Sequence, residues 1–149
     1  MTVANILRMK GDAVYTIGSH NSLADAAHLL AQRKIGALVV TDENGRVTGI
    51  IGEREIVAVL ARGDGAALAE AVRNHMVTDF VSCRRTDSVE HLARVMTNRR
   101  IRHVPVVEDG RLCGVISIGD VVKHRIAETE MELETIKVYI GESRLVSVQ

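Results

Sequence analysis

The stretch of sequence that decides the fold occurs twice in the chain. Residues 21–40 read NSLADAAHLLAQRKIGALVV, and residues 87–107 read DSVEHLARVMTNRRIRHVPVV. The two copies align without a gap from Ser22 and Ser88 to Val40 and Val106. Similarity at a fixed spacing is the signature of a repeat architecture. We therefore predict two copies of one supersecondary unit.

A second shared block follows each copy. Residues 44–51 read NGRVTGII and residues 109–116 read DGRLCGVI, and both blocks place a turn dipeptide between apolar runs. Asn-Gly and Asp-Gly are strong hairpin signals because both residues tolerate positive φ. The alignment slips by one residue between the two blocks, which predicts a longer turn in the first copy.

The first half of each copy has the spacing of an amphipathic helix. Apolar residues recur at i, i+3, i+4 and i+7, in the sets Leu23, Ala26, Ala27, Leu30 and Val89, Leu92, Ala93, Met96. Asn21 or Ser22 can cap the first helix, and Asp87 with Glu90 predicts a capping box for the second.

The predicted unit is strand, helix, strand, strand, helix. Short strands are expected at 14–17 and 80–83, second helices from about Glu53 and Ile118, and a helix-like connection over 66–76. We place the first unit with its connecting helix at 1–74 and the second at 75–149. One unit of about 60 residues buries little surface alone. The predicted fold class is therefore α+β, with the two units packed sheet to sheet about a pseudo-twofold axis.

A long C-terminal helix is predicted after the second hairpin. Its apolar residues are spaced 4-3-4-3-4, as in the a/d seam of a coiled coil, at Val122, Ile126, Thr129, Leu133, Ile136 and Ile140. Glutamates flank the seam at Glu128, Glu130, Glu132 and Glu134. The helix either lies along its own domain or forms a dimer seam.

Composition excludes several classes of function. The 149 residues carry 19 Lys and Arg against 19 Asp and Glu, with 2% aromatic residues. Zero net charge argues against nucleic-acid and anionic-membrane partners, and no apolar stretch is long enough to span a bilayer. The N-terminus is too polar for a signal peptide, and the two cysteines form no CxxC, so we expect a cytoplasmic protein with reduced thiols. The histidines show no metal-binding spacing, so we expect neither a metal site nor an enzyme.

Two motifs in the second copy carry a resemblance to a known family. Residues 101–107 read IRHVPVV and residues 114–120 read GVISIGD. With the duplication, they make the chain resemble the cystathionine-β-synthase (CBS) domain pair, or Bateman module. The first copy departs from both motifs, because Val39 replaces Pro105 and residues 49–55 read GIIGERE. The resemblance implies a non-catalytic regulatory module that binds an adenosine-containing ligand.

The chemistry of the second motif fits such a ligand. A carboxylate such as Asp120 can accept hydrogen bonds from two ribose hydroxyls. Ser117 and the free amides at a helix start can face a phosphate. The same Ser-x-x-Asp pattern is also a capping box, which needs no ligand. Arg102 and His103 add positive charge, and strand alternation predicts that only one of them faces a given cleft.

The resemblance implies two sites between the repeats. The main site would comprise Lys10, Ala13, Val14, Tyr15, Gly36, Ala37, Arg102, His103, Val104, Pro105, Val115, Ile116, Ser117, Gly119 and Asp120. A second, weaker site would comprise Ile50, Gly52, Arg54, Glu55, Phe80 and Val81. Glu55 is one methylene longer than Asp120, so we expect its oxygens to be misplaced. The ring of Tyr15 either contacts the ligand or is half-buried on its strand, and most arginines of the second repeat are expected in solvent.

These observations predict a homodimer that senses an adenine nucleotide and signals to an unknown protein partner. AMP is the expected ligand, with ADP, ATP, NAD(H) or S-adenosylmethionine as alternatives, and no cofactor is required. The alternative hypothesis is a dimeric adaptor whose nucleotide site is vestigial, which the altered first motif supports.

Overall fold

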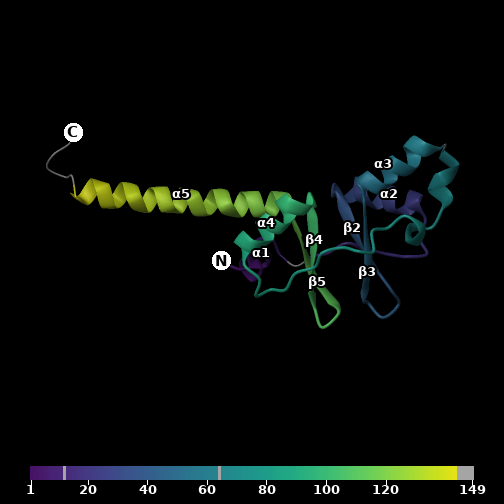
Figure 1. Ribbon diagram of the computed structural model, residues 1–149, viewed down its shortest axis with the longest axis horizontal. Helices are drawn as coiled ribbons and strands as arrows, with labels where there is room; N and C mark the ends of the chain where they lie inside the picture. Colours follow the sequence, from purple (N-terminus) through teal and green to yellow (C-terminus); the bar gives the residue numbers. More distant parts are fainter. Residues whose placement is uncertain (12, 64, 144–149) are drawn as a thin grey trace.

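A computed structural model describes residues 1–11, 13–63 and 65–143 of the chain. It contains two hairpin-based units side by side, with their helices on the outer flanks and one long helix extending away (Figure 1). The last six residues of the predicted second unit, 144–149, lie outside the described residues.

The first unit matches the predicted element order. It consists of β1 (Thr16–Gly18), α2 (Leu23–Arg33), β2 (Ala37–Thr41), β3 (Val47–Gly52) and α3 (Glu53–Arg62). β2 pairs parallel with β1 and antiparallel with β3. The apolar helical stripe packs on the sheet, so Leu23, Leu38 and Ile51 are completely buried.

The second unit repeats this order except for its first strand. It consists of α4 (Val89–Arg99), β4 (His103–Glu108), β5 (Arg111–Ser117) and α5 (Ile118–Ser143), with β4 antiparallel to β5. Asp109 and Gly110 both have positive φ in its tight turn. The longer turn predicted for the first copy is confirmed, because residues 42–46 separate β2 from β3 whereas only residues 109–110 separate β4 from β5. In the longer turn, Asp42 Oδ1 accepts from the amides of Asn44 and Arg46.

The strand predicted at 80–83 is wrong apart from its last residue. Cys83 alone bridges to Val106 in β4. The chain then leaves the sheet because side chains bind the next amides: Asp87 Oδ2 accepts from Arg84 N and Glu108 Oε1 accepts from Arg85 N. The second sheet therefore has two full strands where the first has three.

The structure decides which residue caps α2 and corrects the predicted cap of α4. Ser22, not Asn21, caps α2, since its Oγ accepts from the Asp25 amide at 3.0 Å. The predicted box of Asp87 with Glu90 is wrong, because α4 is capped by Ser88, whose Oγ accepts from the His91 amide at 3.0 Å. Asp87 is engaged in the preceding turn.

The connection between the units is not the predicted helix. It forms two 3₁₀ turns, η1 (Gly65–Ala69) and η2 (Val72–Asn74). Some of its amides bond within these turns, but two of them bond to the first unit: Val72 N donates to Asn21 O and Arg73 N donates to Ser19 O. These contacts prevent a continuous helix.

The structure contains an N-terminal helix that the sequence did not predict. Although it precedes the first unit in the chain, it packs in the core of the second unit. α1 (Val3–Lys10) contributes Val3, Ile6 and Leu7 to the apolar cluster of the second unit, which includes Leu92 and Met96. The sequence boundary at residue 74 therefore does not divide the two packed cores.

Equivalent contacts relate the two units by a pseudo-twofold axis. Thr2 bridges to Ser88 just before α1, and Ala71 bridges to Ser22 just before η2. The matching residues Arg46 and Arg111 bridge to one another between the two hairpins. Each unit is thus completed by a segment that precedes the first strand of the other.

Candidate functional site

The second motif forms the predicted capping box at the start of α5. Asp120 Oδ2 accepts from the Ser117 amide at 2.8 Å, and Ser117 Oγ accepts from the Asp120 amide at 3.1 Å. The two side chains therefore stabilise the helix start whether or not a ligand is present. The capping box, which the sequence left open as an alternative to a ligand site, is therefore formed. Any contact of Ser117 or Asp120 with a ligand would be additional to it.

The first motif builds the same helix start with different residues. Glu55 Oε1 accepts from the Gly52 amide at 2.8 Å, which is the length of the equivalent Asp120 hydrogen bond. This hydrogen bond does not test where Glu55 would place its oxygens toward a ligand, so that expectation stays a prediction. One oxygen of each carboxylate thus binds the amide of the residue just before its helix.

Asp120 has a second partner, which Glu55 lacks within the described residues. Lys10 Nζ lies 2.7 Å from Asp120 Oδ2 and also donates to the carbonyl of Val115 at 2.7 Å. Burial raises the pKa of Asp120, but hydrogen bonds from Lys10 and the Ser117 amide outweigh it and hold the pKa below the usual 3.8. Asp120 is therefore an ion-paired carboxylate.

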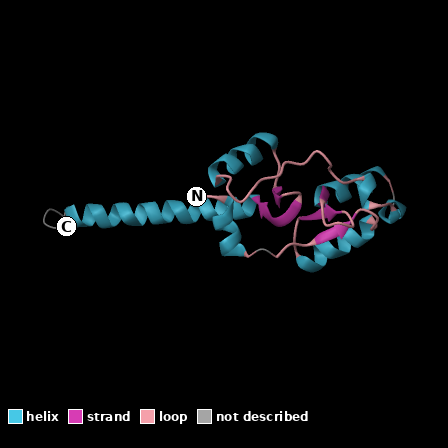
Figure 2. Ribbon diagram, turned by 90° about the horizontal axis from the view of Figure 1, so that it is seen from below, coloured by secondary structure: helices cyan, strands magenta, loops and turns pink. Residues whose placement is uncertain are grey.

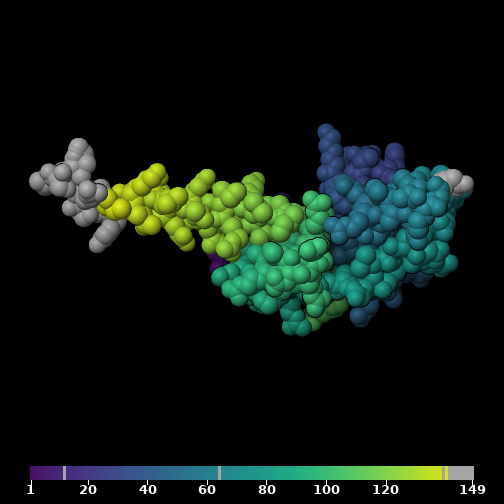
Figure 3. Space-filling model, turned by 45° about the horizontal axis from the view of Figure 1, so that its top comes forward, coloured from purple at the N-terminus to yellow at the C-terminus, as the bar shows by residue number. Residues whose placement is uncertain are grey.

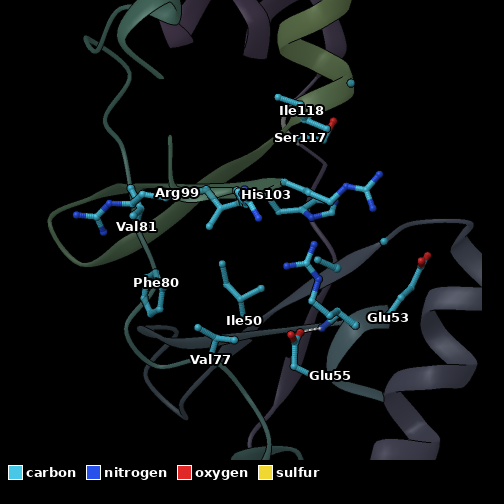
Figure 4. Close-up of a pocket in the computed structure, with 18 of the residues that line it drawn as sticks. Ile50, Glu53, Glu55, Val77, Phe80, Val81, Arg99, His103, Ser117 and Ile118 are labelled. Carbon is cyan, nitrogen blue, oxygen red and sulfur yellow. Dashed lines mark hydrogen bonds between the residues drawn. The ribbon is translucent and has the colours of Figure 1, made fainter. Parts of the chain in front are cut away.

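A cavity of about 860 Å³ lies between the two units. Figure 4 shows Ser117 and Ile118 at one side and Ile50, Val77 and Glu55 at the other. Its lining residues are Gly36, Ala37, Ile50, Gly52, Glu53, Arg54, Glu55, Val57, Val77, Asp79, Phe80, Val81, Arg99, Arg100, Ile101, Arg102, His103, Ser117, Ile118 and Gly119.

The cavity joins the two sets of residues expected from sequence. It contains the whole of the second set and, from the first, Gly36, Ala37, Arg102, His103, Ser117 and Gly119. The remaining first-set residues do not line it: Val104, Pro105 and Ile116 are buried in strands, and Lys10 holds Asp120. Tyr15 lies 4.9 Å from Arg33, whose guanidinium covers its ring.

His103 and Arg102 both line the cavity, so the expectation that only one would do so is wrong. The alternation argument fails because Arg102 precedes β4, which begins at His103. A Cβ on Gly36 would lie 3.1 Å from His103 Cε1, so the absence of a side chain permits this close approach. Burial, and next the charge of Arg102, lower the pKa of His103 below 6.5, which favours a neutral imidazole near pH 7.

Several charged residues of the cavity were not among the site residues expected from sequence. Arg99 and Arg100 are exposed, and they line the cavity beside Arg102. Glu53 and Asp79 also line it. Arg100 turns the chain there with a positive φ of 55° at the end of α4. In the sequence, Arg100 lies between a predicted helix and the strand that precedes the second motif. This position was the signal that could have placed it near the cavity.

The lining offers three kinds of contact. The arginines and the amides at the starts of α3 and α5 can attract an anion. The Glu55 carboxylate can accept hydrogen bonds from hydroxyls. Ile50, Val77 and Val81 provide apolar surface. Together these contacts suit a small molecule with an anionic, a hydroxylated and a flat apolar part.

The described residues contain no group of three or more His, Cys, Asp or Glu side chains arranged to hold a metal ion. Among the helices of the described part of the chain, none has the length and continuous hydropathy needed to cross a membrane.

The fold and the inter-repeat cavity define a tandem-repeat ligand-binding module. The CBS domain model matches residues 3–62 and 70–127, and the chain belongs to the CBS domain family. A CBS-domain containing protein from Agrobacterium tumefaciens is 45% identical, with a TM-score of 0.80 over 84% of this chain and 99% of that one.

Two further relatives are similar over most of this chain. The CBS domain pair of protein MJ0100, solved with 5′-methylthioadenosine and S-adenosyl-L-methionine, is 26% identical, with a TM-score of 0.76 over 86% of this chain and 98% of that one. An uncharacterized 33.4 kDa protein of Thermofilum pendens is 34% identical over 123 residues, 83% of this chain. The chain spans only 39% of that relative's length.

Proposed function

We propose that the protein is a non-catalytic regulatory module that binds an adenosine-containing ligand, with AMP as the first candidate, in the cavity between its repeats. The observation that carries the proposal is the cavity itself, because both units contribute basic, acidic and apolar groups to it. The MJ0100 domain pair, which is similar in fold and sequence, binds adenosyl ligands. The four lining arginines favour a phosphorylated adenosine here.

The proposed pose uses the Glu55 side of the cavity. There the carboxylate faces the ribose hydroxyls, Ile50 and Val77 flank the adenine, and arginines near His103 hold the phosphate. This pose reverses the ranking expected from sequence, in which the Asp120 site binds better. The Lys10 ion pair supports the reversal, because a hydroxyl would have to share Asp120 with an ammonium group.

A ligand in this position would act by shifting a conformational equilibrium. It would contact both units at once, so it would favour the relative orientation in which those contacts fit. A protein partner that reads this orientation would then respond to the ligand concentration.

Thermal-shift measurements with AMP, ADP, ATP, NAD(H) and S-adenosylmethionine test the proposal. A ligand at 100 times its Kd adds roughly 2.7 kcal/mol of stability, which raises the melting temperature measurably. Glu55→Ala should weaken binding roughly 10- to 150-fold, the worth of a charged hydrogen bond. Glu55→Gln keeps an oxygen for the Gly52 amide and separates loss of the cap from loss of the charge.

Asp120→Ala is the matched variant on the other side. A larger loss of affinity in Asp120→Ala than in Glu55→Ala would place the ribose at the second motif, as the sequence predicts. The alternative function, an adaptor with a vestigial site, is favoured by the ion pair that occupies Asp120. It would be supported if no ligand raised the melting temperature of protein free of bound nucleotide.

A further inference from the structure

The C-terminal helix leaves the body of the molecule and carries an apolar stripe with it. Val121 and His124 of α5 are buried against the second unit. From Thr129 to Val138, every residue is exposed. Figures 2 and 3 show this part of α5 standing clear of the rest of the chain. A helical segment of this length is only marginally stable in water without a packing partner.

The exposed stripe follows the a/d pattern of a coiled coil. Ile126 and Leu133 occupy position a of the heptad, and Val122 and Ile136 occupy position d. All four are about half exposed: Ile126 53%, Leu133 50%, Val122 49% and Ile136 50%. Thr129 occupies the remaining d position between them. This spacing forms one continuous seam along the helix.

The body of the protein lies on the other side of this helix. Between residues 121 and 128, the buried residues are Val121 and His124, at heptad positions c and f, and the partly buried ones are Ala127 and Glu128, at b and c. These positions form the outer surface of a coiled coil, away from a and d. A second helix can therefore lie along the seam from Val122 outward without meeting the body of its own chain.

Charges beside the seam identify the partner as a second copy in parallel orientation. Arg125 and Glu132 occupy g, whereas Glu130 and Lys137 occupy e. In a parallel pair, g faces the following e of the other helix, so Arg125 meets the partner's Glu130 and Glu132 meets the partner's Lys137. Both pairs are of opposite sign. All four side chains are exposed, and within the described ranges none has an ion pair in its own chain.

The antiparallel arrangement fits less well. The antiparallel register that pairs Val122 with Ile140 sets Glu130 against Glu130 and Glu132 against Glu132, which are repulsive contacts. It also places Thr129 opposite Leu133. In the parallel arrangement, Thr129 meets its own counterpart, and every other layer is apolar.

We propose that α5 forms a parallel two-stranded coiled coil with α5 of a second copy, through Val122, Ile126, Thr129, Leu133 and Ile136. The two ligand-binding bodies then lie on the outside of one shared stalk and at the same end of it. This inference does not depend on the identity of the ligand, or on whether one binds.

The mass of the full chain in solution, measured by light scattering across a dilution series, tests the association. Wild type should be a dimer, and Leu133→Glu should weaken it by more than roughly 100-fold, because a charge would be buried in the seam. Met131→Glu is the matched control: Met131 is 68% exposed but lies at f, on the outer face. A monomeric wild type, a trimer or tetramer, or a dimer that survives Leu133→Glu would overturn the proposal.

Charge reversal and crosslinking test the orientation. Glu130→Lys with Lys137→Glu should weaken the dimer, and adding Arg125→Glu and Glu132→Lys to the same chain should restore it. Thr129→Cys should form an intermolecular disulfide, whereas Met131→Cys and wild type should not. Folding of each variant is checked by circular dichroism. Absence of both the rescue and the disulfide in folded protein would overturn the parallel arrangement.

Discussion

At the scale of single residues, Asp120 shows how one side chain can satisfy two interpretations of a motif. Its carboxylate caps α5 and is ion-paired with Lys10, so its position is explained without a ligand. The sequence contained the capping pattern and the motif, but not the ion pair, because Lys10 reaches Asp120 across 110 residues. Contacts at that separation depend on the assembled fold.

The ion pair predicts a dependence of stability on pH. The pKa of Asp120 in the folded protein lies below its usual 3.8. The charged carboxylate therefore stabilises the fold at pH values above the unfolded pKa, and this contribution is lost as the pH falls through the folded pKa. Asp120→Asn should be less stable than wild type at pH 7, and the difference should shrink toward pH 3, as measured by urea unfolding.

Lys10→Met is the control for this prediction. It removes the ammonium group but leaves the capping box, so it should reduce the difference between pH 7 and pH 3 only in part. A difference between wild type and Asp120→Asn that stayed constant over this range would show that the carboxylate charge contributes nothing.

At the scale of elements, helices and hairpins follow from local sequence. Apolar periodicity located α2 and α4, and the Asn-Gly and Asp-Gly dipeptides located both turns. Local signals failed where backbone groups bond to another element. The connection at 66–76 became two 3₁₀ turns for this reason, and the strand at 80–83 was reduced to Cys83.

The cap of α4 gives a prediction at this scale. Asp87, Ser88 and Glu90 could each take part in a cap, but the structure assigns that role to Ser88. Ser88→Ala should therefore lower the free energy of unfolding by about 1 kcal/mol in urea titrations. Glu90→Ala should cost less, about 0.3–0.5 kcal/mol, because Glu90 only forms an exposed i,i+4 ion pair with Arg94. A larger cost for Glu90→Ala would favour the capping box expected from sequence.

At the scale of the whole molecule, each unit is completed by a segment that the repeat alignment assigns to the other unit. We call these two segments the exchanged segments. α1 packs on the second unit, and the segment after η2 packs on the first. The repeat was visible in the sequence, but this exchange was not, because apolar residues do not indicate which core they enter. The position of the cavity depends on the exchange, since four residues of the segment that passes between the units line it: Val77, Asp79, Phe80 and Val81.

Two equivalent glycines allow the exchanged segments to approach. A Cβ on Gly49 would lie 2.9 Å from the carbonyl oxygen of Val77, whereas a Cβ on Gly114 would meet the end of the Leu7 side chain. A backbone group moves less easily than a side-chain methyl. Gly49→Ala should therefore destabilise the protein by about 1–3 kcal/mol, and Gly114→Ala by less.

Gly63→Ala is the matched control, because a Cβ there would meet nothing within 4 Å. Thermal unfolding of the three variants gives the order directly. Equal stability of Gly49→Ala and Gly63→Ala would mean that the segment after η2 does not pack closely on β3.

The central claim is that an adenosine-containing ligand binds in the cavity between the repeats. Titration of the ¹⁵N-labelled protein with AMP, followed through its glycine amide signals, tests this claim most directly. We expect shifts at Gly36, Gly52 and Gly119, which line the cavity, and none at the hairpin glycines Gly45 and Gly110. Shifts at Gly11 beside Lys10 without shifts at Gly52, or no shifts with AMP or any other ligand of the panel, would contradict it.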